Sequence, residues 1–155
     1  MYKTLCVAVL LLPTFALTQA RNPAAAPVSP PIVAKGKLVN QTAPIPQTTI
    51  FTPIQSGLYR LSVYGTVTTG TCGGSYWNVN PEWTDDSGLQ SNTNQIIQSN
   101  GSCLGSFILG YAGYATGATV TFEAKGGTAV TYSVTQQGPP DGSAYSLYYT
   151  LERLE

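Results

Sequence analysis

The densest group of side chains that could do chemistry lies between residues 76 and 86 (YWNVNPEWTDD). Its aromatic and acidic members are Tyr76, Trp77, Trp83, Asp85 and Asp86, and Asn78, Asn80 and Glu82 are interleaved with them. Exposed aromatic rings can stack on the apolar face of a sugar ring, while amides and carboxylates hydrogen-bond the hydroxyl groups of the sugar. The cluster therefore suggests a lectin-like carbohydrate-binding platform.

The same cluster has other interpretations. Trp77 and Trp83 stand six residues apart, which puts both on one face of a strand and favours their burial in a core. Asp85 and Asp86 could serve a glycosidase as acid and nucleophile, but nothing beyond their presence supports that reaction. Asp85 and Asp86, together with Glu82, could also supply oxygen ligands for calcium, but their spacing lacks the pattern of an EF-hand loop. We expect no metal and no cofactor.

The composition excludes the commonest catalytic units. The chain of 155 residues contains no histidine, so it cannot build a Ser-His-Asp or Cys-His unit or a metal site based on imidazole. Only 9% of the residues are charged, whereas 16 glycines, 11 prolines and 10 tyrosines favour strands and turns over helices. These counts favour a non-enzymatic, all-β protein.

Residues 1–20 predict a signal peptide. Lys3 supplies a short positive start, Leu5–Ala16 is mainly apolar, and Thr18-Gln19-Ala20 offers small residues for cleavage. The apolar stretch is shorter than the roughly 20 residues that a membrane-spanning helix needs. We therefore expect a secreted or cell-surface protein whose mature chain starts near Arg21 and has no membrane span.

Residues 21–47 predict a Pro/Ala-rich extended arm or linker. Its first part, Asn22–Pro31, has four prolines in ten residues and favours an extended spacer, whereas Ile32–Ile45 could add an edge strand to a sheet. The arm carries three cations and no anion, while residues 48–155 carry three cations and seven anions. An acidic domain without a clustered basic face disfavours a nucleic-acid partner.

From residue 48 onward, short alternating segments are separated by turns. Leu58–Thr69 and Ala144–Leu154 place alternate Tyr, Leu and Val side chains on one face, as half-buried antiparallel strands do. Asn100-Gly101 predicts a hairpin turn into a strand over Ser102–Tyr111, and Lys125-Gly126-Gly127 predicts a second hairpin.

About eight strands and no helix can be traced over residues 48–155. This pattern predicts an antiparallel two-sheet jelly-roll sandwich of about eight to ten strands, with an immunoglobulin-like sandwich as the alternative.

Two cysteines remain once the predicted signal peptide and its Cys6 are removed. Cys72 and Cys103 each lie beside a glycine-rich turn, and export would expose them to an oxidising compartment. A disulfide between them would close a loop of about 31 residues and stabilise the fold by roughly 3 to 4 kcal/mol in the chain-entropy model. Two unpaired thiols are the alternative. A redox pair is disfavoured because the cysteines lack a Cys-x-x-Cys spacing.

Several short motifs resemble known β-domains. They are Phe51-Thr52-Pro53, residues 56–64 (SGLYRLSVY), Trp83-Thr84-Asp85, residues 127–133 (GTAVTYS), Tyr145-Ser146-Leu147 and residues 151–154 (LERL). Together they resemble a group of uncharacterised bacterial and phage-associated secreted β-domains. They are more remotely similar to the tumour necrosis factor and complement globular-head jelly rolls, which share a Gly-x-Tyr opening of a central strand and a Tyr/Leu-rich final strand.

The resemblance covers residues 48–155. It implies a jelly roll of eight or ten strands that forms a homotrimer through aromatic and aliphatic residues of its inner sheet. The segment 70–75, which contains Cys72, departs from the pattern of the group, and so does Cys103. This departure suggests an adaptation specific to these loops.

Two functional hypotheses follow. The first is an exported, non-enzymatic structural or adhesion module that self-associates as a homotrimer. We expect Tyr59, Tyr132, Tyr145 and Tyr149 to fill the core. An apolar surface that an oligomer could bury is then left to Tyr64, Tyr114, Tyr148 and Leu154. The second is a carbohydrate-binding module that holds a glycan or cell-surface partner on residues 76–86. A glycosidase using the carboxylates is a distant third.

Overall fold

The computed structural model describes residues 29–69, 76–98, 102–104, 107–109, 115–138 and 142–155, and within them all regular structure is β. The strands are β1 (Ile32–Gln41), β2 (Ile45–Phe51), β3 (Gly57–Thr69), β4 (Tyr76–Asp85), β5 (Gly88–Ser91), β6 (Asn94–Gln98), β7 (Ser102–Leu104), β8 (Phe107–Leu109), β9 (Ala115–Ala124), β10 (Val130–Gln137) and β11 (Ala144–Arg153). The predicted signal peptide lies outside the described residues.

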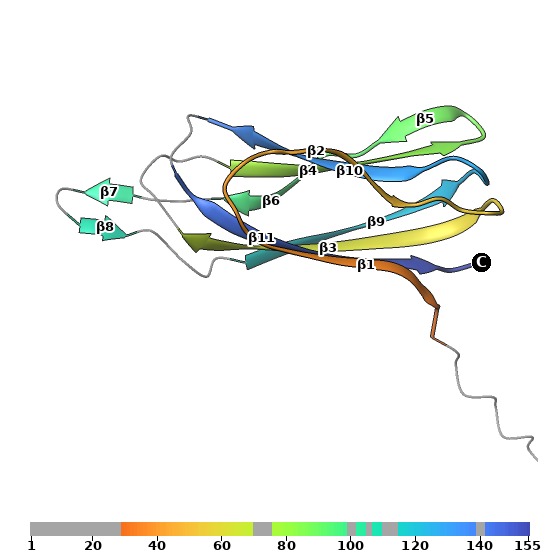
Figure 1. Cartoon of the computed structure of the whole chain (residues 1–155), viewed down its shortest axis with the longest axis horizontal. Helices are drawn as coiled ribbons and strands as arrows, with labels where there is room; N and C mark the ends of the chain where they lie inside the picture. The colour runs from red at the N-terminus through yellow and green to blue at the C-terminus, as the bar shows by residue number, and fades with distance from the viewer. Residues whose placement is uncertain (1–28, 70–75, 99–101, 105–106, 110–114, 139–141) are drawn as a thin grey trace, which may run out of the picture.

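Two antiparallel sheets form the layers of a sandwich (Figure 1). Sheet A has the order β1-β11-β3-β9, and sheet B has the order β2-β10-β4-β5. Strand β6 also pairs with β4, but at residues 76–79, whereas β5 pairs with residues 82–85. Because β10 already occupies the other edge of β4, β5 and β6 together fill one position at the edge of sheet B.

The strand order is that of a jelly roll. Consecutive strands lie in opposite sheets at β1 and β2, β3 and β4, β9 and β10, and β10 and β11. In an immunoglobulin-like sandwich, by contrast, several consecutive strands pair within one sheet. The predicted two-sheet jelly roll is therefore confirmed, and the immunoglobulin-like alternative is not adopted by the chain.

The expected hairpin at Lys125-Gly126-Gly127 is wrong. Strand β9 pairs with β3 in sheet A, whereas β10 pairs with β2 and β4 in sheet B. The turn residues contact sheet B. The Lys125 amide donates to the Thr84 carbonyl oxygen on β4 at 2.7 Å, and the Gly127 amide donates to the Pro53 carbonyl oxygen, just after β2, at 2.7 Å. Both strands show the same alternation because each faces the shared core from its own side.

The strand expected over residues 102–111 also differs. Its described part consists of β7 and β8, which pair with each other and not with β6. The Asn100-Gly101 turn lies outside the described residues.

The sheets begin before residue 48. Strand β1 pairs with β11 along residues 32–41, and β2 pairs with β10 from Ile45 onward. The edge strand that Ile32–Ile45 could add is therefore present, and the expected boundary between arm and domain falls inside β2. Proline lacks a backbone N–H group. It is therefore tolerated in an edge strand, where one side of the strand forms no ladder hydrogen bonds.

The core is joined by aromatic pairs that reach from one sheet to the other. Trp77 lies against Tyr145 and Trp83 against Phe122, both with ring centroids 4.6 Å apart. Two further pairs, Phe51 with Tyr59 and Tyr132 with Tyr149, also connect the sheets. Aliphatic side chains such as Leu61, Val79, Val130, Val134, Leu147 and Leu151 fill the space between these rings.

Candidate functional site

The two tryptophans of the predicted sugar platform are core residues. Trp77 is 1% exposed and Trp83 is 9% exposed, and each packs against a ring of the opposite sheet. Their rings cannot lie on a sugar without opening the sandwich. The interpretation of both tryptophans as buried residues on one strand face therefore fits the structure, and the platform built on their rings does not.

The remaining members of that group are not brought together. Tyr76 is half-buried at the start of β4, and Asp85 ends the same strand, so roughly 30 Å of extended chain separates them. The Asp85 carboxylate accepts hydrogen bonds from the Ser87 amide at 2.7 Å and from Gln90 at 3.3 Å, which closes the turn into β5. Asp86 is exposed in this turn.

A metal site is not apparent in these residues. Within the described ranges, no three His, Cys, Asp or Glu side chains gather closely enough to hold a metal ion.

The predicted interface residues are partly brought together. Tyr64 on β3 and Tyr148 on β11 face each other across the middle of sheet A, and their ring centroids are 5.8 Å apart. Lys37 on the neighbouring strand β1 places its Nζ atom 5.6 Å from the centre of the Tyr148 ring. Leu154 lies elsewhere, since its amide donates to the Leu58 carbonyl oxygen beyond the end of β11. Tyr114 is outside the described residues.

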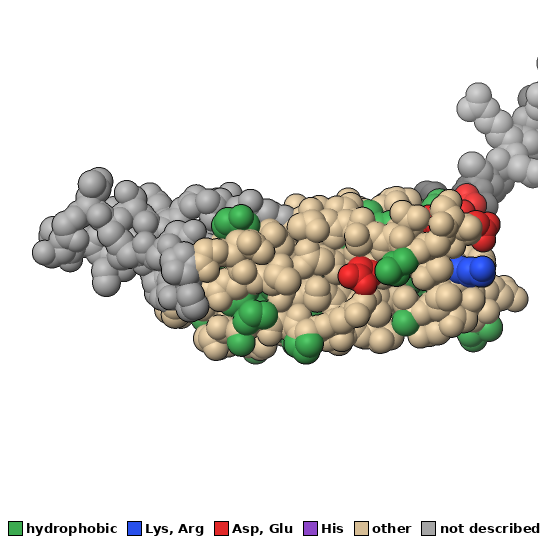
Figure 2. All heavy atoms as spheres, turned by 90° about the horizontal axis from the view of Figure 1, so that it is seen from above, with side chains coloured by type: hydrophobic (Ala, Val, Ile, Leu, Met, Phe, Trp, Pro, Cys, Tyr) green, Lys and Arg blue, Asp and Glu red, His purple; other side chains and the backbone are tan. Residues whose placement is uncertain are grey.

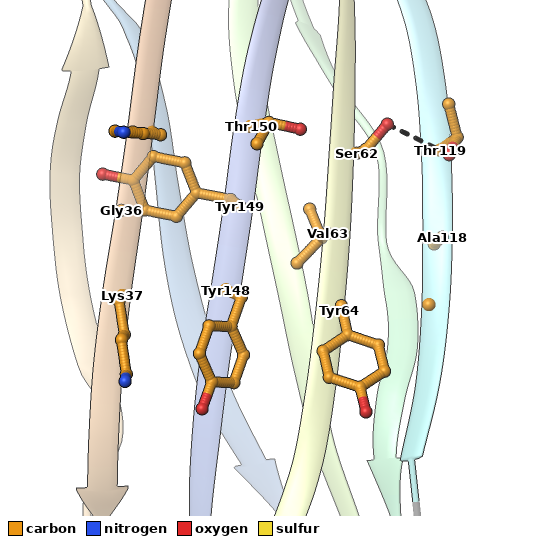
Figure 3. A pocket seen from close by; sticks show the side chains of 12 residues that line it. Gly36, Lys37, Ser62, Val63, Tyr64, Ala118, Thr119, Tyr148, Tyr149 and Thr150 are labelled. Atoms are coloured by element: carbon orange, nitrogen blue, oxygen red, sulfur yellow. Dashed lines mark hydrogen bonds between the residues drawn. The ribbon is translucent and has the colours of Figure 1, made fainter.

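An open hollow of about 550 Å³ lies beside this tyrosine pair on the outer face of sheet A (Figure 3). Register explains its shape. One row across the sheet consists of Lys37, Tyr148, Tyr64 and Gly117, and the next row consists of Lys35, Thr150, Ser62 and Thr119. The short side chains of the second row leave space beside the large rings of the first. The walls are aromatic rings, methyl groups and the aliphatic stems of the lysines.

Two glycines shape sheet A on its two sides. On the outer side, Gly117 stands opposite Tyr64, so β9 contributes no side chain next to that ring. On the core side, Gly36 of β1 has the ring of Tyr149 packed directly on its backbone, at the place where a Cβ atom would sit. A side chain at Gly36 would therefore collide with Tyr149, and the close approach of β1 to that ring requires glycine.

Charge is confined to the margins of this face. The two lysines stand on the edge strand β1, and Arg60 on β3 donates to the Glu152 carboxylate on β11 at 2.7 Å. Apart from the two lysines, the two rows described above carry only uncharged side chains. This distribution suits contact with an uncharged, partly apolar surface better than binding of an ion.

Sequence reasoning found part of this surface. Tyr64 and Tyr148 were expected from their place on the outer side of alternating strands, and both are there. The hollow-lining residues Lys35, Ser62, Gly117, Thr119 and Thr150 were missed, because strand alternation shows which side a residue faces but not which strand lies next to it. No local signal in the sequence would have found them.

The disulfide remains a prediction. Cys72 is outside the described residues, and for Cys103 only the backbone of β7 is described.

Comparison with known proteins gives distant likenesses only. No family model matches the chain, and no curated protein matches it. Several solved structures are similar to it in part. One is "Structure of Eiger TNF from S. frugiperda", with 13% identity and a TM-score of 0.44, covering 81% of this chain and 94% of that one.

Two more of these structures include carbohydrate-binding modules. One is titled "Family 16 Carbohydrate Binding Module-2", with 16% identity and a TM-score of 0.34, covering 74% of this chain and 73% of that one. The other is the Clostridium thermocellum endo-1,4-beta-D-xylanase 10B CBM22-1-GH10 modules with xylohexaose, with 14% identity and a TM-score of 0.35, covering 70% of this chain and 19% of that one.

None of the described residues forms a helix with the length and apolar character required to cross a membrane.

Proposed function

We propose that this protein is an exported, non-enzymatic structural or adhesion module that assembles with copies of itself through the outer face of sheet A. The observation that carries the proposal is the tyrosine pair beside the hollow. Tyr64 is 47% exposed although it lies on the central strand β3, packed against Tyr148 on β11. Aromatic side chains in the middle of a sheet face, with charges only at its margins, are typical of protein interfaces.

Burial of this face would be favourable. Each square ångström of apolar surface removed from water contributes about 25 cal/mol, and tyrosine can keep its hydroxyl group hydrogen-bonded while its ring is covered. The hollow offers a complementary shape, because a ring or aliphatic side chain of a second copy could occupy the space beside Tyr64. The Arg60–Glu152 ion pair would lie near the rim of such a contact.

The proposed assembly is a homotrimer. Its support is the sequence resemblance to jelly rolls that form homotrimers through their inner sheet, together with the position of Tyr64 and Tyr148 on sheet A. A closed ring of three copies would cover this face on every subunit and leave no open end for further growth. Export is supported by the signal-peptide pattern of residues 1–20.

Light scattering across a range of protein concentrations tests the proposal. We expect a mass three times that of one chain for the parent protein, and a monomer for Tyr64→Glu and Tyr148→Glu, because each change places an unpaired charge in the interface. Thr49→Glu is the matched control, since it adds the same charge on the exposed outer side of β2 in sheet B. A parent protein that stays monomeric at high concentration, or a trimer unaffected by both substitutions, would refute the assembly.

Carbohydrate binding through the Trp77 and Trp83 rings is not proposed, because both rings are buried.

A further inference from the structure

The outer face of sheet B is polar but almost uncharged. Its outward side chains are Tyr76, Asn78, Asn80, Glu82 and Thr84 on β4, Thr131, Ser133, Thr135 and Gln137 on β10, Gln47 and Thr49 on β2, and Leu89 and Ser91 on β5. Among these residues Glu82 alone carries a charge. Figure 2, which views the molecule from the side of sheet B, shows a broad surface with few acidic or basic side chains and with scattered, separate hydrophobic ones.

The polar groups on this face are held in place by hydrogen bonds between strands. The Asn80 side-chain amide on β4 donates to the Thr135 hydroxyl group on β10 at 3.1 Å. The Gln47 side-chain amide on β2 donates to the Glu82 carboxylate and, at 3.2 Å, to the Thr131 hydroxyl group. Side chains that are already ordered lose less conformational entropy when they bind a ligand.

The chemistry of the face selects a class of partner. A nucleic acid or another polyanion would need cations, and the outward side chains of β2, β4 and β10 include none. A hydrophobic segment would need an apolar groove, whereas this face presents amides and hydroxyl groups. Amides offer both donors and acceptors, which match the hydroxyl groups of a neutral sugar chain.

We propose that the outer face of sheet B binds a neutral polysaccharide chain that lies along β4. Asn78, Asn80 and Glu82 hydrogen-bond its hydroxyl groups, and the ring of Tyr76 stacks on a sugar at one end of the row. From Tyr76 to Glu82 the strand extends roughly 20 Å, enough for several consecutive sugar rings.

This site uses the outward residues of the strand that carries the buried tryptophans. Alternation along β4 turns Trp77 and Val79 into the core and Asn78 and Asn80 toward solvent. The site lies on the opposite side of the sandwich from Tyr64 and Tyr148. Glycan binding and self-association are therefore independent, and the failure of one leaves the other intact.

Affinity electrophoresis in native gels tests the proposal with defined probes. The purified full chain is run in gels that contain hydroxyethylcellulose, dextran or galactomannan, which are neutral, and in gels that contain carboxymethylcellulose. The last probe has the same backbone as hydroxyethylcellulose but is anionic. We expect retardation by at least one neutral polymer. Carboxymethylcellulose should bind more weakly than hydroxyethylcellulose if the latter is bound, because its carboxylates meet Glu82 and no cation.

Two substitutions locate the site. Asn80→Ala and Tyr76→Ala should each weaken binding about tenfold, the effect of losing one hydrogen bond or one ring contact worth about 1.4 kcal/mol. Thr121→Ala is the matched control, since it removes an exposed polar side chain on the outer side of β9 in sheet A and should leave binding unchanged. Tryptophan fluorescence reports whether each variant keeps its buried indoles.

Three results would overturn the proposal. The first is no retardation by any neutral polymer, and the second is binding that both substitutions leave unchanged in folded variants. The third is stronger retardation by carboxymethylcellulose than by hydroxyethylcellulose, because it would indicate binding of anions by the lysines of β1 instead.

Discussion

The indole ring of Trp77 on β4 lies 4.6 Å from the phenol ring of Tyr145 on β11, so that a single contact joins the interior of sheet B to that of sheet A. Tyr145 is fully buried and donates its hydroxyl hydrogen to the Ala43 carbonyl oxygen at 3.2 Å, in the segment between β1 and β2. A residue that resembled part of a ligand platform is thus a connection between the two layers.

Replacing Trp77 with alanine should leave a cavity between the two sheets. It should therefore lower the free energy of unfolding by about 3 to 5 kcal/mol. Urea denaturation measures the change. Tyr76→Ala is the matched control from the next position on the same strand, where the side chain faces outward, and it should cost less than about 1 kcal/mol. Equal losses for the two variants would contradict the assignment of Trp77 to the core.

Stability should fall at alkaline pH. Burial raises the pKa of Tyr145 well above its usual value, with a smaller contribution from the charge of Tyr132, and burial followed by the charge of Tyr149 raises the pKa of Tyr132. Because the folded state holds these protons more tightly, their contribution to stability is complete below about pH 10, where an unfolded tyrosine titrates, and is lost as the pH rises further.

Denaturation curves at successive pH values would show this decline. Tyr145→Phe removes the ionisable group and keeps the ring, so the variant should lose less stability between neutral and alkaline pH than the parent protein does. A parent protein with constant stability above about pH 10 would contradict the prediction.

Gly36→Ala should destabilise the protein by about 1 to 3 kcal/mol, since the added methyl group collides with the ring of Tyr149. Thermal or urea unfolding measures the loss. The same change in a Tyr149→Leu background should cost less, because the shorter side chain leaves room at Gly36. Val39→Ala, at an exposed position on the same strand, is the control. Additive effects of the two substitutions would exclude the contact.

Cys72 and Cys103 should form a disulfide in the exported protein. Mass spectrometry of the unreduced protein after thiol alkylation should show neither cysteine modified. Reduction should lower the free energy of unfolding by roughly 3 to 4 kcal/mol. Cys72→Ala should have the stability of the reduced parent and should leave the Cys103 thiol free to react. Alkylation of both thiols without reduction would refute the pairing.

Much of the fold follows from alternation alone. In β3, Tyr59, Leu61 and Val63 are buried while Tyr64 faces solvent, as the period of two residues predicts. The same rule puts Trp77 and Trp83 on one side of β4. It could not separate a core position from an exposed aromatic platform, because both sides of a sheet can carry aromatic residues, and only the packing of sheet A against that side distinguishes them.

Local propensity and a period of two residues suffice to predict the all-β class, the approximate strand positions and the side on which each residue of a strand lies. They do not predict which strands are neighbours, and that arrangement emerges only in the folded sandwich. Tyr64 and Tyr148 are far apart in the chain, and Lys125-Gly126-Gly127 connects two sheets where a hairpin was expected. A strand shows the same alternation whichever partner it pairs with, so the pairing is set by how the whole set of apolar faces closes around one core.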